Sequence, residues 1–131
     1  GSNKYLERNG MPKNINDLNK HKFISFGKGA PSPVYNPDWA LKLGMHDGKK
    51  RKSIMKVNSV MGLLLAVESG VGLAALPDYL VSNSNNLIRV LPKSEGPITE
   101  AHFVYPQSLK STARVQAFRN FLFSKIGDWK A

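Results

Sequence analysis

The side chains best suited to holding a ligand are Asn58 and Ser59, which directly precede a long apolar stretch. Residues 53–57 are strand-like, and an Asn-Ser pair is a typical N-cap for the helix that residues 60–69 predict. A helix N-terminus offers free backbone N–H groups and partial positive charge, which favour a carboxylate or phosphate. The sequence therefore predicts an anion-binding position at Asn58 and Ser59, against the simpler interpretation that they only cap their helix.

Few other residues have the type or spacing that catalysis or metal binding requires. The chain has no Cys, which excludes disulfides, thiolate metal sites and Cys nucleophiles. His21, His46 and His102 are far apart and have no carboxylates at ligand spacing. The sequence has no nucleophile elbow or phosphate loop, and residues 70–72 (GVG) end a helix rather than open one. We therefore expect no enzyme, no metal site and no cofactor.

The formal net charge of +10 on 131 residues can attract nucleic acid or an acidic partner, or can simply keep the protein soluble. A nucleic-acid face would interleave basic and aromatic residues, and no such pattern is present. The dense basic run Lys49–Lys52 follows Asp47-Gly48, a hairpin-turn dipeptide. The sequence therefore predicts that this run is the solvated start of a strand.

The elements that must position Asn58 and Ser59 form a β-α-β unit. A strand over Ser53–Val57 is followed by a helix over Val60–Ser69, and Gly70 fits the left-handed residue that ends it. Residues 71–76 then predict a buried strand, and Pro77 the first residue of another helix. A charge, three glycines and a proline within residues 60–77 argue against a membrane span. Parallel strands bind ligands beyond their carboxyl ends, which places the expected site before the helix.

The remaining segments predict one domain with further helices and strands. Among the helices, we expect a helical turn stopped by Gly10, and a short helix that is capped by Asn14 or Asn16 and ended by a cationic His21. Among the strands, we expect Phe23–Phe26, a hairpin of Trp39–Leu43 with Ser53–Val57, and two more over Leu87–Leu91 and Thr99–Tyr105. The last element should be a helix over Ser111–Ile126, with an apolar face of Val115, Phe118, Leu122 and Ile126.

Several short motifs follow one another in order along nearly the whole chain. They are YLERNGMP (5–12), DL and H (17–18 and 21), W (39), VNS (57–59), GVGLAALP (70–77), LIRVLP (87–92), FVYP (103–106) and VQAFRNFL (115–122). Each motif is weak alone, but in this order and spacing they resemble the effector-binding domain of LysR-type transcriptional regulators.

The resemblance implies an α/β fold: a type 2 periplasmic-binding-protein-like lobe, with a mixed sheet flanked by helices and a partial second lobe. Residues 3–100 would be the second lobe of the effector domain, and residues 101–131 the return strand and C-terminal helix of lobe one. We expect Gly1 and Ser2 to be a cloning scar outside the fold, and the rest of lobe one and the DNA-binding domain to be absent. The apolar face of the final helix should then be covered by lobe two, a second copy or an exchanged segment.

The resemblance also implies a function: sensing a small molecule between two lobes and passing that signal to DNA. It adds the loop Phe26, Gly27, Lys28 and Gly29 to Asn58 and Ser59 as expected effector contacts. Lys28 would pair with a carboxylate, or would be solvated as loop lysines usually are. The expected partners are an anionic effector, a second copy of the chain, and DNA only through the absent N-terminal domain, in the cytoplasm and without a membrane. The alternative is a periplasmic solute-binding protein, which the closing VQAFRNFL helix disfavours.

Overall fold

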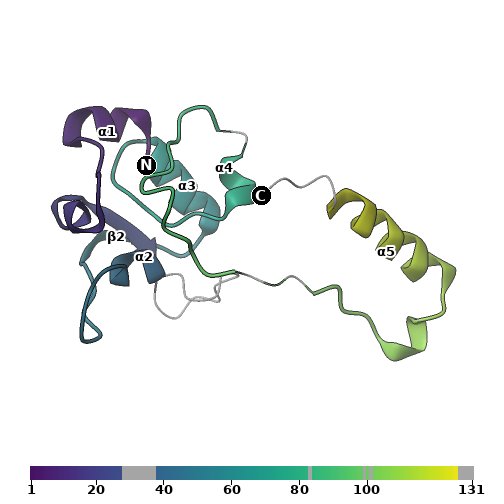
Figure 1. The fold of residues 1–131 in the computed structure, drawn as a ribbon. Helices are drawn as coiled ribbons and strands as arrows, with labels where there is room; N and C mark the ends of the chain where they lie inside the picture. The colour runs from purple at the N-terminus through teal and green to yellow at the C-terminus, as the bar shows by residue number, and fades with distance from the viewer. Residues whose placement is uncertain (28–37, 83, 99, 101, 127–131) are drawn as a thin grey trace. The chain divides into compact units, whose positions relative to one another are not determined.

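The computed structural model describes residues 1–27, 38–82, 84–98, 100 and 102–126. They divide into two compact units, Gly1–Ile98 and Thr99–Ala131. Figure 1 follows the elements by colour, from α1 in purple to α5 in yellow. The first unit contains α1 (Asn3–Asn9), η1 (Ile15–Lys20), β1 (Phe23–Phe26), α2 (Trp39–Lys42), β2 (Ser53–Val57), α3 (Val60–Glu68) and α4 (Asp78–Val81). The second contains η2 (Gln107–Leu109) and α5 (Ala113–Ile126).

The sheet of the first unit is parallel, as the β-α-β prediction requires. β1 pairs with β2, from Phe23 opposite Ser53 to Phe26 opposite Val57, with one irregularity after Phe23. On the other side of β1, Leu73 forms a single parallel bridge to Phe23. The peptide N–H of Ile24 donates to the carbonyl oxygen of Leu73 at 2.8 Å. β1 therefore lies between β2 and the Leu73 segment, although residues 71–76 form this one bridge rather than the expected strand.

The predicted hairpin of Trp39–Leu43 with β2 is wrong. Trp39–Lys42 is the helix α2, and the pairing edge of β2 is taken by β1. Asp47 and Gly48 do form a turn with positive φ, at 57° and 68°. The chain after this turn is tied back by Arg51, whose N–H donates to the carbonyl oxygen of Leu41 at 2.9 Å. Helical geometry lets α2 turn Leu41, which is 3% exposed, into the core.

Two other predicted strands are absent from the described residues. Within Leu87–Leu91, only Leu87 forms a bridge, which is antiparallel to Ser2. Residues 102–105 belong to no strand. A strand requires partners for its backbone groups along its length, and among the described residues Leu87–Leu91 has them only at Leu87 and Ile88, which meet Ser2 and Gly1.

Gly1 and Ser2, which we expect to be a cloning scar, pack within the first unit. Ser2 is 1% exposed, and its hydroxyl caps α1 by accepting from the N–H of Tyr5 at 3.4 Å. The N–H of Ile88 donates to the carbonyl oxygen of Gly1 at 2.8 Å. These two residues therefore hold α1 against the Leu87 segment.

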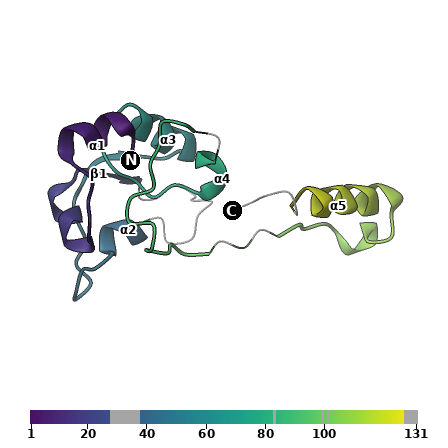
Figure 2. The same ribbon diagram turned by 45° about the horizontal axis from the view of Figure 1, so that its top comes forward.

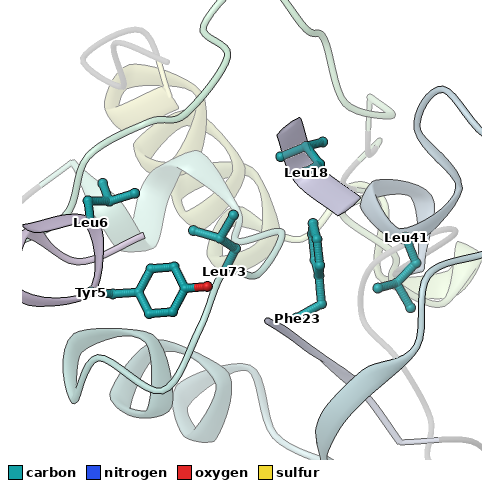
Figure 3. Close-up of a cluster of buried hydrophobic side chains, with 6 residues drawn as sticks. All are labelled: Tyr5, Leu6, Leu18, Phe23, Leu41 and Leu73. Carbon is teal, nitrogen blue, oxygen red and sulfur yellow. The ribbon is translucent and has the colours of Figure 1, made fainter. Parts of the chain in front are cut away.

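Two apolar clusters form the core of the first unit. Side chains from α1, η1, β1, α2 and the Leu73 segment gather in the cluster of Figure 3, and Figure 2 shows these helices around β1. Its members are Tyr5, Leu6, Leu18, Phe23, Leu41 and Leu73. The second cluster packs α3 on β1 through Ile24, Leu63, Ala66 and Val67. Met61 and Leu65 are 52% and 58% exposed, so α3 buries one face only.

The helix ends follow the predicted capping residues. Asn14 caps η1, and Gly10 and Gly70 adopt positive φ of 81° and 79° at the ends of α1 and α3. His21 ends η1 as expected. The expectation that its protonated, cationic form is favoured there is wrong. Burial lowers the pKa of His21 below its ordinary value of 6.5, against the raising effect of Asp17.

The second unit confirms the predicted final helix. In α5, Phe118, Phe121, Phe123 and Ile126 are each more than half exposed. The ring of Phe118 packs edge-on against Phe103, with centroids 5.6 Å apart. What covers this apolar face stays a prediction.

Among all the described residues, no helix combines the length and apolarity needed to cross a membrane.

Candidate ligand site

The carboxyl ends of β1 and β2 meet at one edge of the sheet. Phe26 lies opposite Val57, and the N–H of Gly27 donates to the carbonyl oxygen of Val57 at 2.7 Å. A Cβ built on Gly27 would lie 4.0 Å from the Cβ of Asn58. The structure therefore places Phe26 and Gly27 beside Asn58 and the start of α3, as predicted for a ligand site.

Ser59 caps α3. Its hydroxyl oxygen accepts from the N–H of Gly62 at 3.4 Å, and its carbonyl oxygen accepts from the N–H of Leu63 at 2.9 Å. The N–H groups of the two first residues, Val60 and Met61, form no hydrogen bond within the described part of the chain. Ser59 therefore caps its helix, as the simpler interpretation holds. The N–H donors of Val60 and Met61 remain for a ligand.

Asn58 has a different status. Its side chain is exposed and forms no hydrogen bond to any residue that the structure describes. The helix does not use this amide as a cap, because Ser59 fills that role. Asn58 is therefore free to contact a ligand. Lys28 and Gly29, the other two predicted contacts, lie outside the described residues.

A cavity of about 250 Å³ adjoins this edge, with Phe26 in its wall. Ser25 of β1 and Ser53 of β2 line it, and their hydroxyl groups are joined by a 2.9 Å hydrogen bond. Its charged lining consists of Lys50, Arg51, Lys52, Lys56 and the carboxylate of Asp38. Lys50 holds Oδ2 of that carboxylate at 2.8 Å, while Oδ1 is buried without a partner. The cavity therefore carries an excess of positive charge that suits an anion.

Arg51 corrects the prediction for the basic run, because it is 9% exposed rather than solvated. Its Nη1 donates to the carbonyl oxygen of Leu43 at 2.7 Å and its Nη2 to that of Ile15 at 3.3 Å. Its guanidinium carbon lies 5.9 Å from the centre of the Phe23 ring. Burial lowers the pKa of Arg51 below its ordinary value. All of these acceptors are neutral, so Arg51 joins three segments and adds uncompensated positive charge to the wall of the cavity.

The sequence analysis missed Ser25, Ser53 and Lys56 as possible ligand contacts. The available signal was a serine inside the apolar strand FISF, which needs a polar neighbour once it is buried. The predicted hairpin did not place Ser25 beside β2, because it paired β2 with residues 39–43. Parallel pairing with β1 brings Ser25 and Lys56 opposite each other.

The described residues contain no group of three or more His, Asp or Glu side chains that could hold a metal ion. The nearest approach is an exposed pair, with Nε2 of His102 3.6 Å from Oε2 of Glu100. The site chemistry that the structure offers consists of hydroxyl, amide and cationic groups, which bind oxyanions.

Comparison with known proteins identifies the family. The family model for the LysR substrate binding domain matches residues 1–126. A curated relative from Haemophilus influenzae, described as an uncharacterized HTH-type transcriptional regulator, is 31% identical over 106 residues. The alignment covers 78% of this chain and 35% of the relative, so the chain spans about a third of that protein's length. No solved structure matches the chain. The chain therefore belongs to the LysR substrate binding domain family.

Proposed function

We propose that this domain senses a small anionic effector at the edge where β1 and β2 end. The observation that carries the proposal is the 2.7 Å hydrogen bond from Gly27 to Val57, which joins the two strand ends. It brings the backbone of Gly27, the amide of Asn58 and the N-terminus of α3 to one place. Phe26 connects this edge to the cationic cavity, which supplies charge of the sign an anion needs.

In the longer protein, effector occupancy would act on an N-terminal DNA-binding domain in the cytoplasm, through closure of this lobe on lobe one. The domain itself would perform no catalysis. Such coupling requires that the effector bind one arrangement of the lobes more tightly than the other. This part of the proposal rests on the family match and on the regulator that the relative is named as.

We further propose that the chain works as a homodimer or larger homo-oligomer. Met61 and Leu65 lie one helical turn apart on α3 and are exposed, as are Ile54 and Met55 on β2. We call Met61 and Leu65 the α3 apolar surface. In the described part of the sheet, β2 pairs on one side only. An exposed strand edge beside apolar side chains favours association, and the exposed face of α5 adds to this tendency.

The effector proposal is tested by screening a panel of small carboxylates and phosphate esters for a rise in melting temperature of this chain. The same panel is run on Asn58→Ala and, as a matched control, on Asn85→Ala, which changes an exposed asparagine away from the site. We expect at least one anion that stabilises the parent chain and the control but loses tenfold or more in affinity with Asn58→Ala. Compounds that bind the parent chain and Asn58→Ala equally would place the effector elsewhere.

A further inference from the structure

A second cavity, of about 780 Å³, lies where the segment between α1 and η1 meets residues 89–94. It shares no lining residue with the cavity beside Phe26. Its volume falls within the roughly 300–1,000 Å³ that is usual for pockets holding small organic ligands. A cavity of this size, separate from the proposed effector site, is large enough for a ligand of its own.

The lining combines an apolar surface with cations. The apolar part comes from Met11, Pro12, Ile15, Leu91 and Pro92. The charged groups among the lining residues are Lys13, Arg89 and Lys93, and no lining residue is acidic. None of these three side chains forms an ion pair with another described residue. The complementary ligand has an apolar body and a negative charge.

One wall of this cavity is fixed by the capping box of η1. The N–H groups of Lys13 and Asn14 donate to Oδ2 of Asp17 at 2.9 and 3.2 Å, and Oδ1 of Asn14 accepts from the N–H of Asn16 at 2.9 Å. The carboxylate of Asp17 is the nearest acidic group along this segment, and both of these hydrogen bonds hold it on the backbone. It is therefore placed to order the wall rather than to neutralise the three cations.

The opposite wall contains a strained residue. Leu91 has a φ of 50°, in the left-handed region that residues other than glycine rarely adopt. Its side chain packs against the cluster of Figure 3, and its carbonyl oxygen accepts from the N–H of Ser94 at 2.8 Å. Core packing thus holds the 89–94 segment in a shape that it would not adopt alone. Both walls are ordered before any ligand arrives, which lowers the entropic cost of binding.

We propose that this cavity is a second ligand site, for a small organic monocarboxylate with an apolar body. The carboxylate pairs with Arg89, whose planar guanidinium can form two parallel hydrogen bonds to it, and with Lys93 or Lys13. The apolar body covers Met11, Leu91 and Pro92. Because the ligand contacts both walls, it stabilises the junction between the α1–η1 segment and residues 89–94. This site does not depend on the effector proposal.

The test uses cyclohexanecarboxylate as the probe, with acetate and cyclohexanemethanol as controls that carry only the charge or only the apolar body. Each is titrated into the isotope-labelled chain, and the NMR signals of the Met11 methyl group and of the amides of residues 89–94 are followed. We expect cyclohexanecarboxylate to shift these signals saturably, at least tenfold more tightly than either control. Equal affinities for all three compounds would overturn the proposal, because the site would then not combine charge with apolar contact.

Substitutions separate this site from the rest of the surface. Arg89→Gln should weaken cyclohexanecarboxylate at least fivefold, whereas Lys42→Gln, which removes an exposed charge outside the cavity, should leave its affinity unchanged. The NMR spectrum of each variant away from the substitution reports that it is folded. An equal loss of affinity in both variants would show that only net charge matters. A loss of affinity in Asn58→Ala instead would place cyclohexanecarboxylate at the proposed effector site. Binding of an acidic peptide without binding of cyclohexanecarboxylate would also overturn the small-molecule assignment.

Discussion

The Nε of Arg51 donates a 2.8 Å hydrogen bond to Oδ1 of Asn19, thirty-two residues earlier in the chain. This bond links the segment before β2 to η1, and the same guanidinium reaches the carbonyl oxygens of Leu43 and Ile15. A basic run that looks like solvated surface thus contains a buried cross-link at its third residue. Neighbouring cations therefore have different roles. Arg51 is buried and stabilises the fold, whereas Lys50 and Lys52 are exposed and available to a ligand.

The buried role of Arg51 can be measured by substitution. Arg51→Met leaves three acceptors without their donors, and we expect it to lower the free energy of unfolding by about 2–4 kcal/mol. Lys52→Met is the matched control and should change it by less than ~0.5 kcal/mol, because Lys52 is exposed. Urea unfolding followed by circular dichroism gives both values. Equal effects in the two variants would contradict the cross-link.

Two glycines should respond to alanine in opposite directions. A Cβ at Gly72 would lie 2.6 Å from the carbonyl oxygen of Lys22, a backbone atom next to β1, so Gly72→Ala should destabilise the first unit by roughly 1–3 kcal/mol. A Cβ at Gly62, inside α3, meets only ordinary contacts at 3.6 Å or more. Gly62→Ala should raise stability by about 0.5–1 kcal/mol, because alanine loses less backbone entropy in a helix. Thermal melting of both variants checks the two signs, and a destabilised Gly62→Ala would contradict the geometry of α3.

The stability of the capping box should depend on pH. The N–H of Lys13 lowers the pKa of Asp17 below 3.8; desolvation opposes this effect, and the N–H of Asn14 lowers the pKa further. A depressed carboxyl pKa contributes stability above 3.8, which is lost as pH falls through the folded-state value, because the unfolded chain takes up the proton first. The loss in Asp17→Asn relative to the parent chain should therefore be largest above pH 4 and shrink toward pH 2.

Asn14→Ala serves as the comparison for that measurement. It removes the other half of the capping box, should cost about 1 kcal/mol, and leaves the Asp17 hydrogen bonds to the backbone in place. Its effect should thus be nearly constant over the same pH range. Urea unfolding at half-unit pH intervals gives both curves, and parallel curves for the two variants would contradict the role assigned to Asp17.

His21 should titrate below 6.5 in the folded chain. Burial favours its neutral form, while Asp17 raises its pKa in the opposite direction. A base whose pKa is lowered on folding contributes stability that is full above 6.5 and is lost as pH falls below it. NMR titration of the ring should give a midpoint below 6.5, and in Asp17→Asn the midpoint should fall further. An unchanged midpoint in that variant would show that the two groups do not interact.

The α3 apolar surface, Met61 and Leu65, should control self-association. Leu65→Lys places a charge on this surface and should shift the chain toward the monomer by tenfold or more in dissociation constant. Asn85→Lys adds the same charge at an exposed position outside this surface and should not. Sedimentation equilibrium measures both constants. A parent chain that remains monomeric at high concentration would contradict the proposed homo-oligomer.

The sequence by itself determined the local elements that surround the proposed ligand site. Asn14, Ser59, Gly10 and Gly70 mark helix ends through backbone geometry that depends on the residue and its immediate neighbours. The strand–helix order around Asn58 then requires parallel pairing, whatever the rest of the chain does. The ordered motifs further identified the family, which the family model confirms.

Only the tertiary structure decided which segments pair and which charged side chains are buried. Trp39–Leu43 has a pattern compatible with helix or strand, and as the helix α2 it buries Leu41 in the core. Arg51 is indistinguishable in sequence from its basic neighbours, and its burial depends on acceptors from residues 15, 19 and 43. The helix α2 and the burial of Arg51 both depend on long-range contacts. A local sequence pattern does not show which distant residues will form those contacts.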